Sequence, residues 1–174
     1  MNRKFLILIT GLPGTGKTTL AKYLTKELNK ISIKTTHLDG ESIRSFFNFR
    51  GHYSKSQRKS LAIFYSNLCK ELILRSDNNI VLSCVALFSE FHKLNKKNFK
   101  NFFQIVIKSK TSKVKKLRKN IFNKKKNSWY IDIKPIYPDK PNLILRNNYK
   151  KDVKILVKQI LDKKLKSFFN KVYS

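Results

Sequence analysis

The sequence predicts an α/β fold in three layers, with a five-stranded parallel sheet between two layers of helices. Short, continuous apolar runs alternate along the chain with amphipathic stretches of helical length. Runs of this kind are typical of parallel strands that are buried on both faces and joined by helices. The expected strands are Phe5–Thr10, Ile33–Leu38, Ile80–Leu87, Phe102–Ile107 and Leu143–Leu145. In such sheets ligands bind beyond the carboxyl ends of the strands, so we expect a site in the loops that follow these runs.

The helices are predicted from apolar spacing and from one capping signal. Residues 17–28 place leucines and an alanine on one face of a helix. Ser54-Lys55-Ser56-Gln57 fits a capping box ahead of a second helix. We expect this helix to carry the apolar residues Leu61, Ile63, Phe64, Leu68 and Leu72. A last helix, with Val153, Ile155, Leu156, Ile160 and Leu161, would close the domain.

Size and composition indicate one folded domain over residues 1–174. The chain has 174 residues, of which 41% are hydrophobic, and this is enough apolar material to bury a core. A disordered basic tail is therefore excluded as a description of the whole chain. We expect a basic C-terminal end over 163–174, with Ser167–Ser174 fraying.

No segment reads as a targeting or membrane-spanning sequence. The apolar run Phe5–Ile9 is too short for a secretory signal, and no run approaches the ~20 apolar residues that span a membrane. We therefore expect a soluble, cytoplasmic protein. Cys69 and Cys84 lie in apolar surroundings, which favours free, packed thiols over a disulfide or a zinc site.

The high positive charge of the chain suggests at first that the protein binds nucleic acid. The formal net charge is +29, and a lysine-rich surface attracts phosphate without reading sequence. However, 32 of the 39 basic residues are lysines, which lack the bidentate fork of arginine. Residues 91–174 alone contribute +21, and much of this excess lies away from the motifs below. We interpret most of these lysines as a solvated face and expect no nucleic-acid partner.

The strongest motif is a phosphate-binding loop at residues 11–18. Gly11-Leu12-Pro13-Gly14-Thr15-Gly16-Lys17-Thr18 matches G-x-x-x-x-G-K-[ST] in full, and it lies between a predicted strand and a predicted helix. Backbone N–H groups at that helix start would surround the phosphates of ATP, Lys17 would reach the β and γ phosphates, and the Thr18 hydroxyl would hold Mg²⁺. The residues expected to bind ATP here are Gly11, Leu12, Pro13, Gly14, Thr15, Gly16, Lys17, Thr18 and Thr19.

A carboxylate and an arginine follow the second strand. Leu38-Asp39-Gly40-Glu41 ends that strand, and Arg44 comes one turn later. Asp39 could accept a proton from an acceptor hydroxyl or hold a magnesium-bound water, and Arg44 offers a planar fork for an anionic acceptor. The structural alternative is a helix-capping Asp beside a surface Arg.

From these residues onward the chain resembles the adenylylsulfate (APS) kinase family of P-loop kinases. Leu38–Arg44 resembles the family's L-D-G-D-x-x-R, and Tyr53-Ser54 with Arg58 resembles its F-S-x-x-D-R. The likeness extends over residues 5–161 and takes in Asn79–Phe88, Phe103–Ile107, Ile131-Asp132, Pro138, Pro141, Asn142 and Leu143.

The resemblance implies a P-loop nucleotide kinase fold, with ATP and Mg²⁺ as cofactors. The γ-phosphoryl group of ATP would pass to the 3′-hydroxyl of a small anionic nucleotide. Asp39 and Lys17 become the catalytic residues, Asp39 joins Thr18 as a metal ligand, and a homodimer is expected. Asp39, Arg44, Arg58 and Val85 become the acceptor contacts.

Two departures concern the acceptor. The family's Asn-x-Arg after Arg58 is replaced by Leu61-Ala62-Ile63, and its Ile-Ser-Pro by Val85-Ala86-Leu87. Tyr65–Lys70 and Phe88–His92, with Asn95 and Asn98, instead resemble a branch that includes cytidine diphosphoramidate kinases. His92 could then touch the acceptor; the alternative is a polar residue on an exposed helix face.

The third departure concerns the lid, at about residues 119–130. The family carries R-D-x-K-G-L-Y and a longer segment, whereas Arg118 is followed here by Lys119–Lys126 without an Asp or a Gly. Arg118 and Lys124–Lys126 could still supply positive charge to the ATP phosphates.

Three functions remain open from the sequence. The first is a kinase of APS kinase type that acts on APS or on a relative such as cytidine diphosphoramidate. The second is a polynucleotide 5′-hydroxyl kinase, which would use the basic surface. The third is a degenerate domain that binds nucleotide and serves as a scaffold.

Overall fold

A single parallel sheet of five strands organises the chain in the computed structural model, which describes residues 3–46, 54–117 and 133–174. The strand order is β2-β3-β1-β4-β5. The strands are β1 (Leu6–Gly11), β2 (Thr35–Asp39), β3 (Asn79–Cys84), β4 (Phe102–Lys108) and β5 (Leu143–Arg146). All four strand pairs are parallel. The predicted α/β class and the five-stranded sheet are confirmed.

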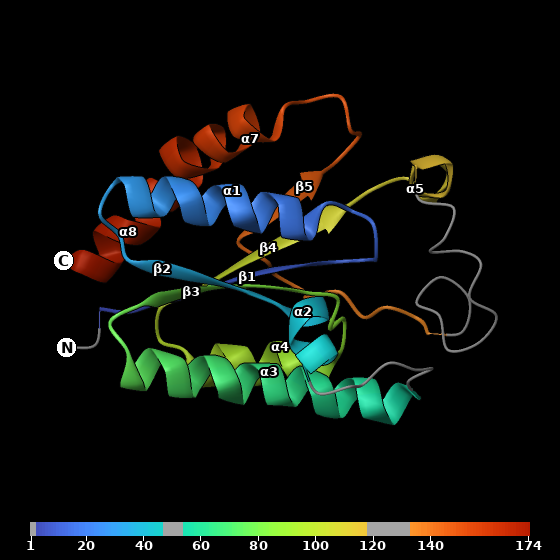
Figure 1. Cartoon of the computed structure of the whole chain (residues 1–174), viewed down its shortest axis with the longest axis horizontal. Helices are drawn as coiled ribbons and strands as arrows, with labels where there is room; N and C mark the ends of the chain where they lie inside the picture. The colour runs from blue at the N-terminus through green and yellow to red at the C-terminus, as the bar shows by residue number, and fades with distance from the viewer. Residues whose placement is uncertain (1–2, 47–53, 118–132) are drawn as a thin grey trace.

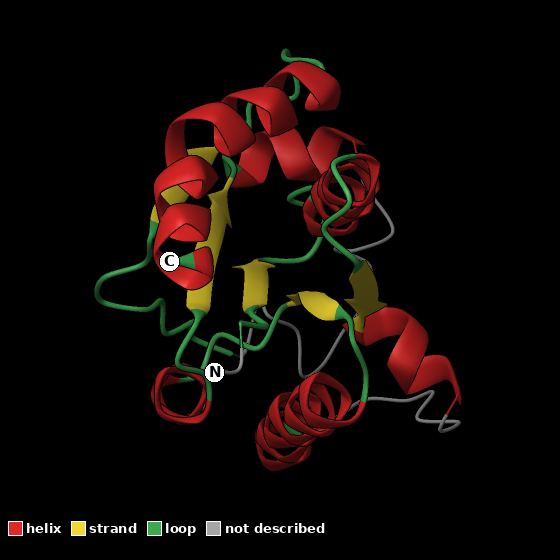
Figure 2. Cartoon of the chain, turned by 90° about the vertical axis from the view of Figure 1, so that its left-hand side faces the viewer, coloured by secondary structure: helices red, strands yellow, loops and turns green. Residues whose placement is uncertain are grey.

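Helices cover both faces of the sheet, which gives the three predicted layers (Figures 1 and 2). One layer contains α1 (Lys17–Lys30), α7 (Val153–Ile160) and α8 (Lys166–Tyr173), with a π-helical turn at Leu161–Leu165 between the last two. The other contains α3 (Lys55–Arg75) and α4 (Ser89–Asn98). The short helices α2 (Gly40–Phe46) and α5 (Thr111–Leu117) follow β2 and β4 at the carboxyl end of the sheet (Figure 1).

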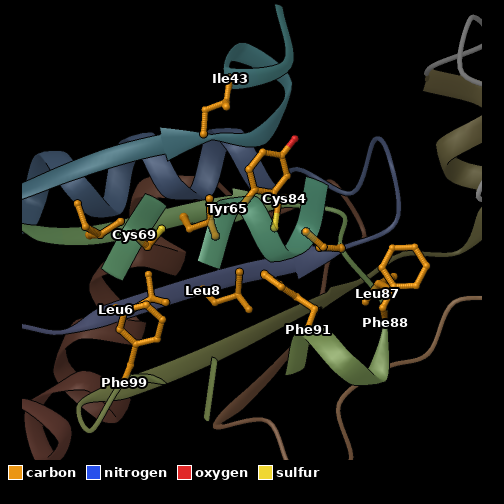
Figure 3. Packing of buried hydrophobic residues seen from close by; sticks show 14 of the residues in the cluster. Leu6, Leu8, Ile43, Tyr65, Cys69, Cys84, Leu87, Phe88, Phe91 and Phe99 are labelled. Atoms are coloured by element: carbon orange, nitrogen blue, oxygen red, sulfur yellow. The ribbon is translucent and has the colours of Figure 1, made fainter. Parts of the chain in front are cut away.

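The central strand β1 divides the core into two clusters because its side chains alternate between the faces. Leu6 and Leu8 pack with α3 and α4, where Tyr65, Cys69 and Phe91 join them (Figure 3). Ile7 and Ile9 pack on the opposite face against α1, α7 and the C-terminal turns. A strand that is buried on both faces reads as one continuous apolar run, which is why β1 is visible in the sequence.

Helix α3 starts as predicted, and its apolar residues are buried to different degrees. Ser54 Oγ accepts from the Gln57 N–H, and the Ser54 N–H donates to Gln57 Oε1, so the capping box is confirmed. The buried residues, however, are Ala62, Tyr65, Ser66, Cys69 and Ile73. Leu61, Leu68 and Leu72 are partly buried against the same core, whereas Ile63 and Phe64 are exposed. The helix is apolar around much of its circumference, and its apolar positions alone did not define which side faces the sheet.

The C-terminal end is a packed helix, and the prediction that Ser167–Ser174 frays is wrong. Phe168 lies 5.7 Å from Phe5 and 5.2 Å from Phe103 between ring centroids, and Val172 is buried. This aromatic contact fixes α8 against the start of β1 and β4. Lys166 and Lys171 are exposed on the same helix, and with the lysines just before it they make the segment read as a basic end in the sequence.

Cys69 and Cys84 are both buried free thiols, as predicted. Burial raises the pKa of Cys84 to about 12, so this thiol stays protonated at neutral pH. Within the described residues, no group of three or more His, Cys, Asp or Glu side chains could hold a metal ion. No helix in this part of the chain is long and apolar enough to cross a membrane.

Candidate active site

The phosphate loop connects β1 to α1 and adopts a backbone that needs its glycines. Gly14 and Gly16 have φ values of 78° and 94°, in the left-handed region that favours glycine. At Gly11 a Cβ atom would lie 2.3 Å from the Ile107 carbonyl oxygen of β4, so this position must lack a side chain. The motif thus fits tightly between the end of β1 and the neighbouring strand.

Lys17 is buried at the start of α1, with 8% of its surface exposed. Its Nζ donates to the Leu12 carbonyl oxygen at 2.9 Å, and the Thr15 hydroxyl donates to the same oxygen at 2.9 Å. Burial lowers the pKa of Lys17 to about 8, although the negative charge of Asp39 acts in the opposite direction. The donors of the loop therefore converge on one oxygen, which is the arrangement that an anionic oxygen of a phosphate would satisfy.

Asp39 lies at the end of β2 and accepts hydrogen bonds on both oxygens. Oδ2 accepts from the hydroxyls of Thr18 and Ser83, each at 2.7 Å. Oδ1 accepts from the backbone N–H groups of Glu41 and Ser42 at 3.0 and 3.1 Å. Burial acts to raise the pKa of Asp39, but these hydrogen bonds outweigh it and leave the pKa below its usual value. Asp39 is therefore ionised at neutral pH, and it is linked directly to the phosphate loop.

The Thr18–Asp39 pair has the chemistry of a magnesium site. Mg²⁺ prefers hydroxyl, carboxylate and phosphate oxygens. Because Thr18 gives its proton to Asp39, the lone pairs of the Thr18 oxygen are available to a cation. The two predicted metal ligands are thus adjacent, and their oxygens fit the ion.

Ser83 and His37 complete this centre, and the sequence did not reveal either. Ser83 pairs with Asp39 in the register of β2 and β3. Its hydroxyl donates to Asp39, so it must accept from His37 Nε2, which lies 2.9 Å from Ser83 Oγ. Burial lowers the pKa of His37. The strand register is the signal that identifies Ser83, and only a structure supplies it.

Gly40, directly after Asp39, is held against the core. Its carbonyl accepts from the Tyr65 hydroxyl at 2.8 Å. A Cβ atom at Gly40 would lie 2.9 Å from Cys84 Cβ and 3.3 Å from a Tyr65 ring carbon. The backbone next to Asp39 is therefore held in place by contacts with α3 and β3.

The predicted acceptor contacts are less completely placed. Arg44 lies on α2, close enough for its charge to lower the pKa of Lys17. Arg58 lies in the first turn of α3. Val85 follows β3, and its carbonyl accepts from the Thr10 hydroxyl at 3.0 Å. Arg118, Tyr53 and the predicted lid at 119–130 lie outside the described residues. The roles of these residues stay predictions.

His92 is neither exposed nor open to an acceptor, so both interpretations of it were wrong. It is 5% exposed on α4. Its Nε2 lies 2.9 Å from the Ile136 carbonyl oxygen and therefore donates to it. Its Nδ1 then accepts from Gln104 Nε2 at 3.1 Å. His92 is a neutral, buried structural residue that ties α4 to β4 and to the segment before β5.

Two further polar residues contact the phosphate loop from the segment that follows β5. Asn147 Nδ2 donates to the Thr15 carbonyl at 3.0 Å, and the Tyr149 hydroxyl donates to the Gly14 carbonyl at 2.8 Å. No motif in the sequence marks these residues, because the contacts join positions more than 130 residues apart.

Comparison with known proteins agrees with this geometry. The sequence model of the adenylylsulphate kinase family matches residues 3–146. The cytidine diphosphoramidate kinase of Campylobacter jejuni is 26% identical over 172 residues, which cover 91% of this chain and 98% of that protein. A probable adenylyl-sulfate kinase of Pyrococcus abyssi is 28% identical over 103 residues, 59% of each chain.

A solved structure shows the same fold. The Mycobacterium tuberculosis APS kinase, in complex with AMPPNP and APS, superposes with a TM-score of 0.73 at 20% identity, covering 92% of this chain and 96% of that one. With a phosphate loop, a carboxylate at the end of β2 and a family match over most of its length, the chain belongs to the adenylylsulphate kinase family of ATP-dependent phosphotransferases.

Proposed function

We propose that the protein transfers the γ-phosphoryl group of ATP to the 3′-hydroxyl of a small anionic nucleotide, either APS or a related compound. The observation that carries this proposal is the hydrogen bond between Thr18 of the phosphate loop and Asp39 of the acceptor-side motif. This hydrogen bond links an ionised carboxylate directly to the phosphate loop, which supports a role for Asp39 next to the transferring phosphoryl group. The family membership supports the same reaction class.

Each residue of the site has a defined task in this reaction. Lys17 and the loop N–H groups bind and orient the phosphates, and Asp39 orients the acceptor hydroxyl and receives its proton. The bond between the γ-phosphorus and the β–γ bridging oxygen breaks, and a bond from the acceptor oxygen to that phosphorus forms. ADP leaves with the bridging oxygen. Thr18 and Asp39 would hold Mg²⁺, which would neutralise charge on the phosphates.

The anionic group of the acceptor requires a cation on the other side of Asp39. Arg44 lies on α2, the helix that follows Asp39, and we assign it to that group together with Arg58. Val85 would line the same side. Arg118, with the lysine cluster at 124–126, is assigned to the ATP phosphates on the family resemblance.

The acceptor has a second candidate, cytidine diphosphoramidate. The Campylobacter jejuni relative that bears this substrate in its name matches along nearly its whole length. The replacement of the family's Ile-Ser-Pro by Val85-Ala86-Leu87 supports a changed acceptor contact. Sulfate and phosphoramidate are both small groups that an arginine can bind, so a direct assay must distinguish them.

The experiment is an acceptor panel measured by ADP release. Purified protein with Mg-ATP is given APS, cytidine diphosphoramidate, a 5′-hydroxyl RNA, or no acceptor. We expect ADP formation with one of the two small nucleotides only. Turnover on RNA that falls steeply with salt would identify a polynucleotide kinase instead. ATP binding without turnover on any acceptor would identify a scaffold.

Matched variants distinguish ADP formed by this protein from ADP formed by a contaminating kinase. Lys17→Ala should abolish ADP formation with every acceptor. Lys26→Ala removes an exposed lysine from the same helix and should leave the rate unchanged. Activity that survives Lys17→Ala would show that another protein produces the ADP.

We also propose a cytoplasmic location, a homodimer and, for the APS reaction, a place in sulfate assimilation. Light scattering of the purified protein tests the dimer: a mass near twice 20.5 kDa is expected, and a mass of 20.5 kDa would contradict it.

A further inference from the structure

The segment after β5 crosses the phosphate loop and contacts two of its carbonyl groups. Asn147 and Tyr149, which we call the strap, donate to the Thr15 and Gly14 carbonyl oxygens at 3.0 and 2.8 Å. A Cβ atom at Gly16 would lie 2.9 Å from Asn147 Nδ2. The strap is thus in close contact with the outer side of the loop at three consecutive residues.

The strap is itself held in one conformation. The Tyr149 N–H donates to Asn147 Oδ1 at 2.8 Å, and the Asn147 N–H donates to the Lys108 carbonyl at the end of β4 at 2.9 Å. Tyr149 has a φ of 61°, a left-handed value that is uncommon for a residue with a side chain. A backbone position of this kind persists where surrounding contacts determine it, and it is a reason to look for function.

The two contacts determine how the loop amides face. In a trans peptide the C=O of one residue and the N–H of the next point in opposite directions. The Gly14 carbonyl shares its peptide with the Thr15 N–H, and the Thr15 carbonyl shares its peptide with the Gly16 N–H. Holding both carbonyls outward therefore turns both N–H groups inward. The Thr15 N–H does lie on the inner side, 3.4 Å from the Leu12 carbonyl oxygen that also accepts from Lys17.

We propose that Asn147 and Tyr149 are positioning residues for the phosphates of ATP. They hold the peptides on either side of Thr15 so that their N–H groups meet the phosphate oxygens without reorientation. A loop with glycines at 11, 14 and 16 would otherwise lose much conformational freedom when it binds an anion. The inference rests on the proposed ATP site and deepens it.

The test uses changes that remove single atoms from the strap. Tyr149→Phe deletes the hydroxyl and keeps the ring. Asn147→Asp keeps the oxygen that accepts from Tyr149 but replaces the amide donor with a charge that faces the Thr15 carbonyl. Asn148→Asp is the matched control, because the Asn148 oxygen accepts from the Lys150 N–H outside the phosphate loop.

The readouts are the dissociation constant of Mg-ATP, measured by calorimetry, and the KM values for ATP and for the acceptor. We expect Tyr149→Phe to weaken ATP binding about 3- to 10-fold, the size of one hydrogen bond, and Asn147→Asp to weaken it more than 10-fold. The KM for the acceptor and the melting temperature without ligand should stay close to the parent values for Tyr149→Phe and Asn148→Asp.

Two results would overturn the inference. One is unchanged ATP binding in both strap variants; the other is a loss of melting temperature in Tyr149→Phe with no selective effect on ATP. These outcomes are distinct from a failure of the proposed function. In that case the parent protein itself would form no ADP with either small nucleotide, or would turn over RNA instead, whatever the strap variants do to ATP binding.

Discussion

Replacing Asp39 by asparagine tests the catalytic centre with the smallest change of shape. The asparagine oxygen can keep the two backbone N–H donors of Glu41 and Ser42. The new amide nitrogen then takes the place of Oδ2 and faces the hydroxyls of Thr18 and Ser83. Both hydroxyls can rotate to accept from it, because a hydroxyl donates and accepts. The fold should therefore tolerate the Asp39→Asn change, while the negative charge and the proton acceptor disappear.

The expected loss of stability is small and the expected loss of activity is large. A hydrogen bond to a charged group contributes ~1.5–3 kcal/mol and a neutral one ~0.5–1.5 kcal/mol, so two exchanged bonds give about 2 kcal/mol. Asp39 is only half-buried, and solvent screening reduces this figure to about 1 kcal/mol. A chain of this size would then melt roughly 2–4 °C lower. The rate should fall by about 10²–10⁴, the usual contribution of a positioned acid–base group.

The assay is ADP release at saturating ATP and acceptor, combined with a thermal melt. A melting temperature within a few degrees of the parent shows that the variant is folded. A folded Asp39→Asn variant that keeps more than a tenth of the parent rate would refute the assignment of Asp39 as the catalytic carboxylate.

Three further predictions follow from buried groups. Lys17→Met should raise the melting temperature of the ligand-free protein below pH 8, and it should abolish stabilisation by ATP. The pKa of Lys17 is about 8 in the folded protein and 10.5 in the unfolded chain. The charged lysine therefore destabilises the fold fully below pH 8, and this cost disappears as pH rises from 8 to 10.5. A lower melting temperature in Lys17→Met would contradict this sign. Gly40→Ala should lower the free energy of unfolding by about 1–3 kcal/mol, because the added methyl group overpacks against Cys84 and Tyr65. A lower midpoint of urea unfolding measures this loss, and an unchanged midpoint would contradict the overpacking. The parent protein should lose stability as pH falls below 6.5, because burial lowers the pKa values of His37 and His92 and the unfolded chain takes up these protons first. Urea unfolding at pH 7.5 and 5.5 measures this loss, and equal stability at both pH values would argue against two buried neutral histidines.

The sequence predicted the parts of the fold that have a local cause. Buried strands appear as apolar runs, and the phosphate loop is a contiguous motif whose glycines are required by its own backbone. Asp39 stands out in the sequence because it ends the second apolar run, and the structure places it as the last residue of β2. In each case neighbouring residues along the chain carry the signal.

The parts that the sequence missed depend on contacts between distant segments. Ser83 reaches Asp39 only through the register of β2 and β3. His92 looks like a surface residue until α4 packs on β4, where Gln104 and the Ile136 carbonyl bind its ring. The C-terminal helix was misjudged because Phe168 and Phe169, which hold it to Phe5, lie in a segment that reads as basic and polar along the sequence.

The strap also sets the time at which the site can form during synthesis. The phosphate loop emerges from the ribosome first, yet two of its peptides are fixed by residues that come 132 and 135 positions later. The strands on either side of β1 are late as well, since β3 begins at Asn79 and β4 at Phe102. Such long-range closure is intrinsically slow. A nascent chain that ends before β5 contains the whole phosphate motif but lacks the two hydrogen bonds from the strap. Full ATP affinity would therefore develop only after the last strand has joined the sheet.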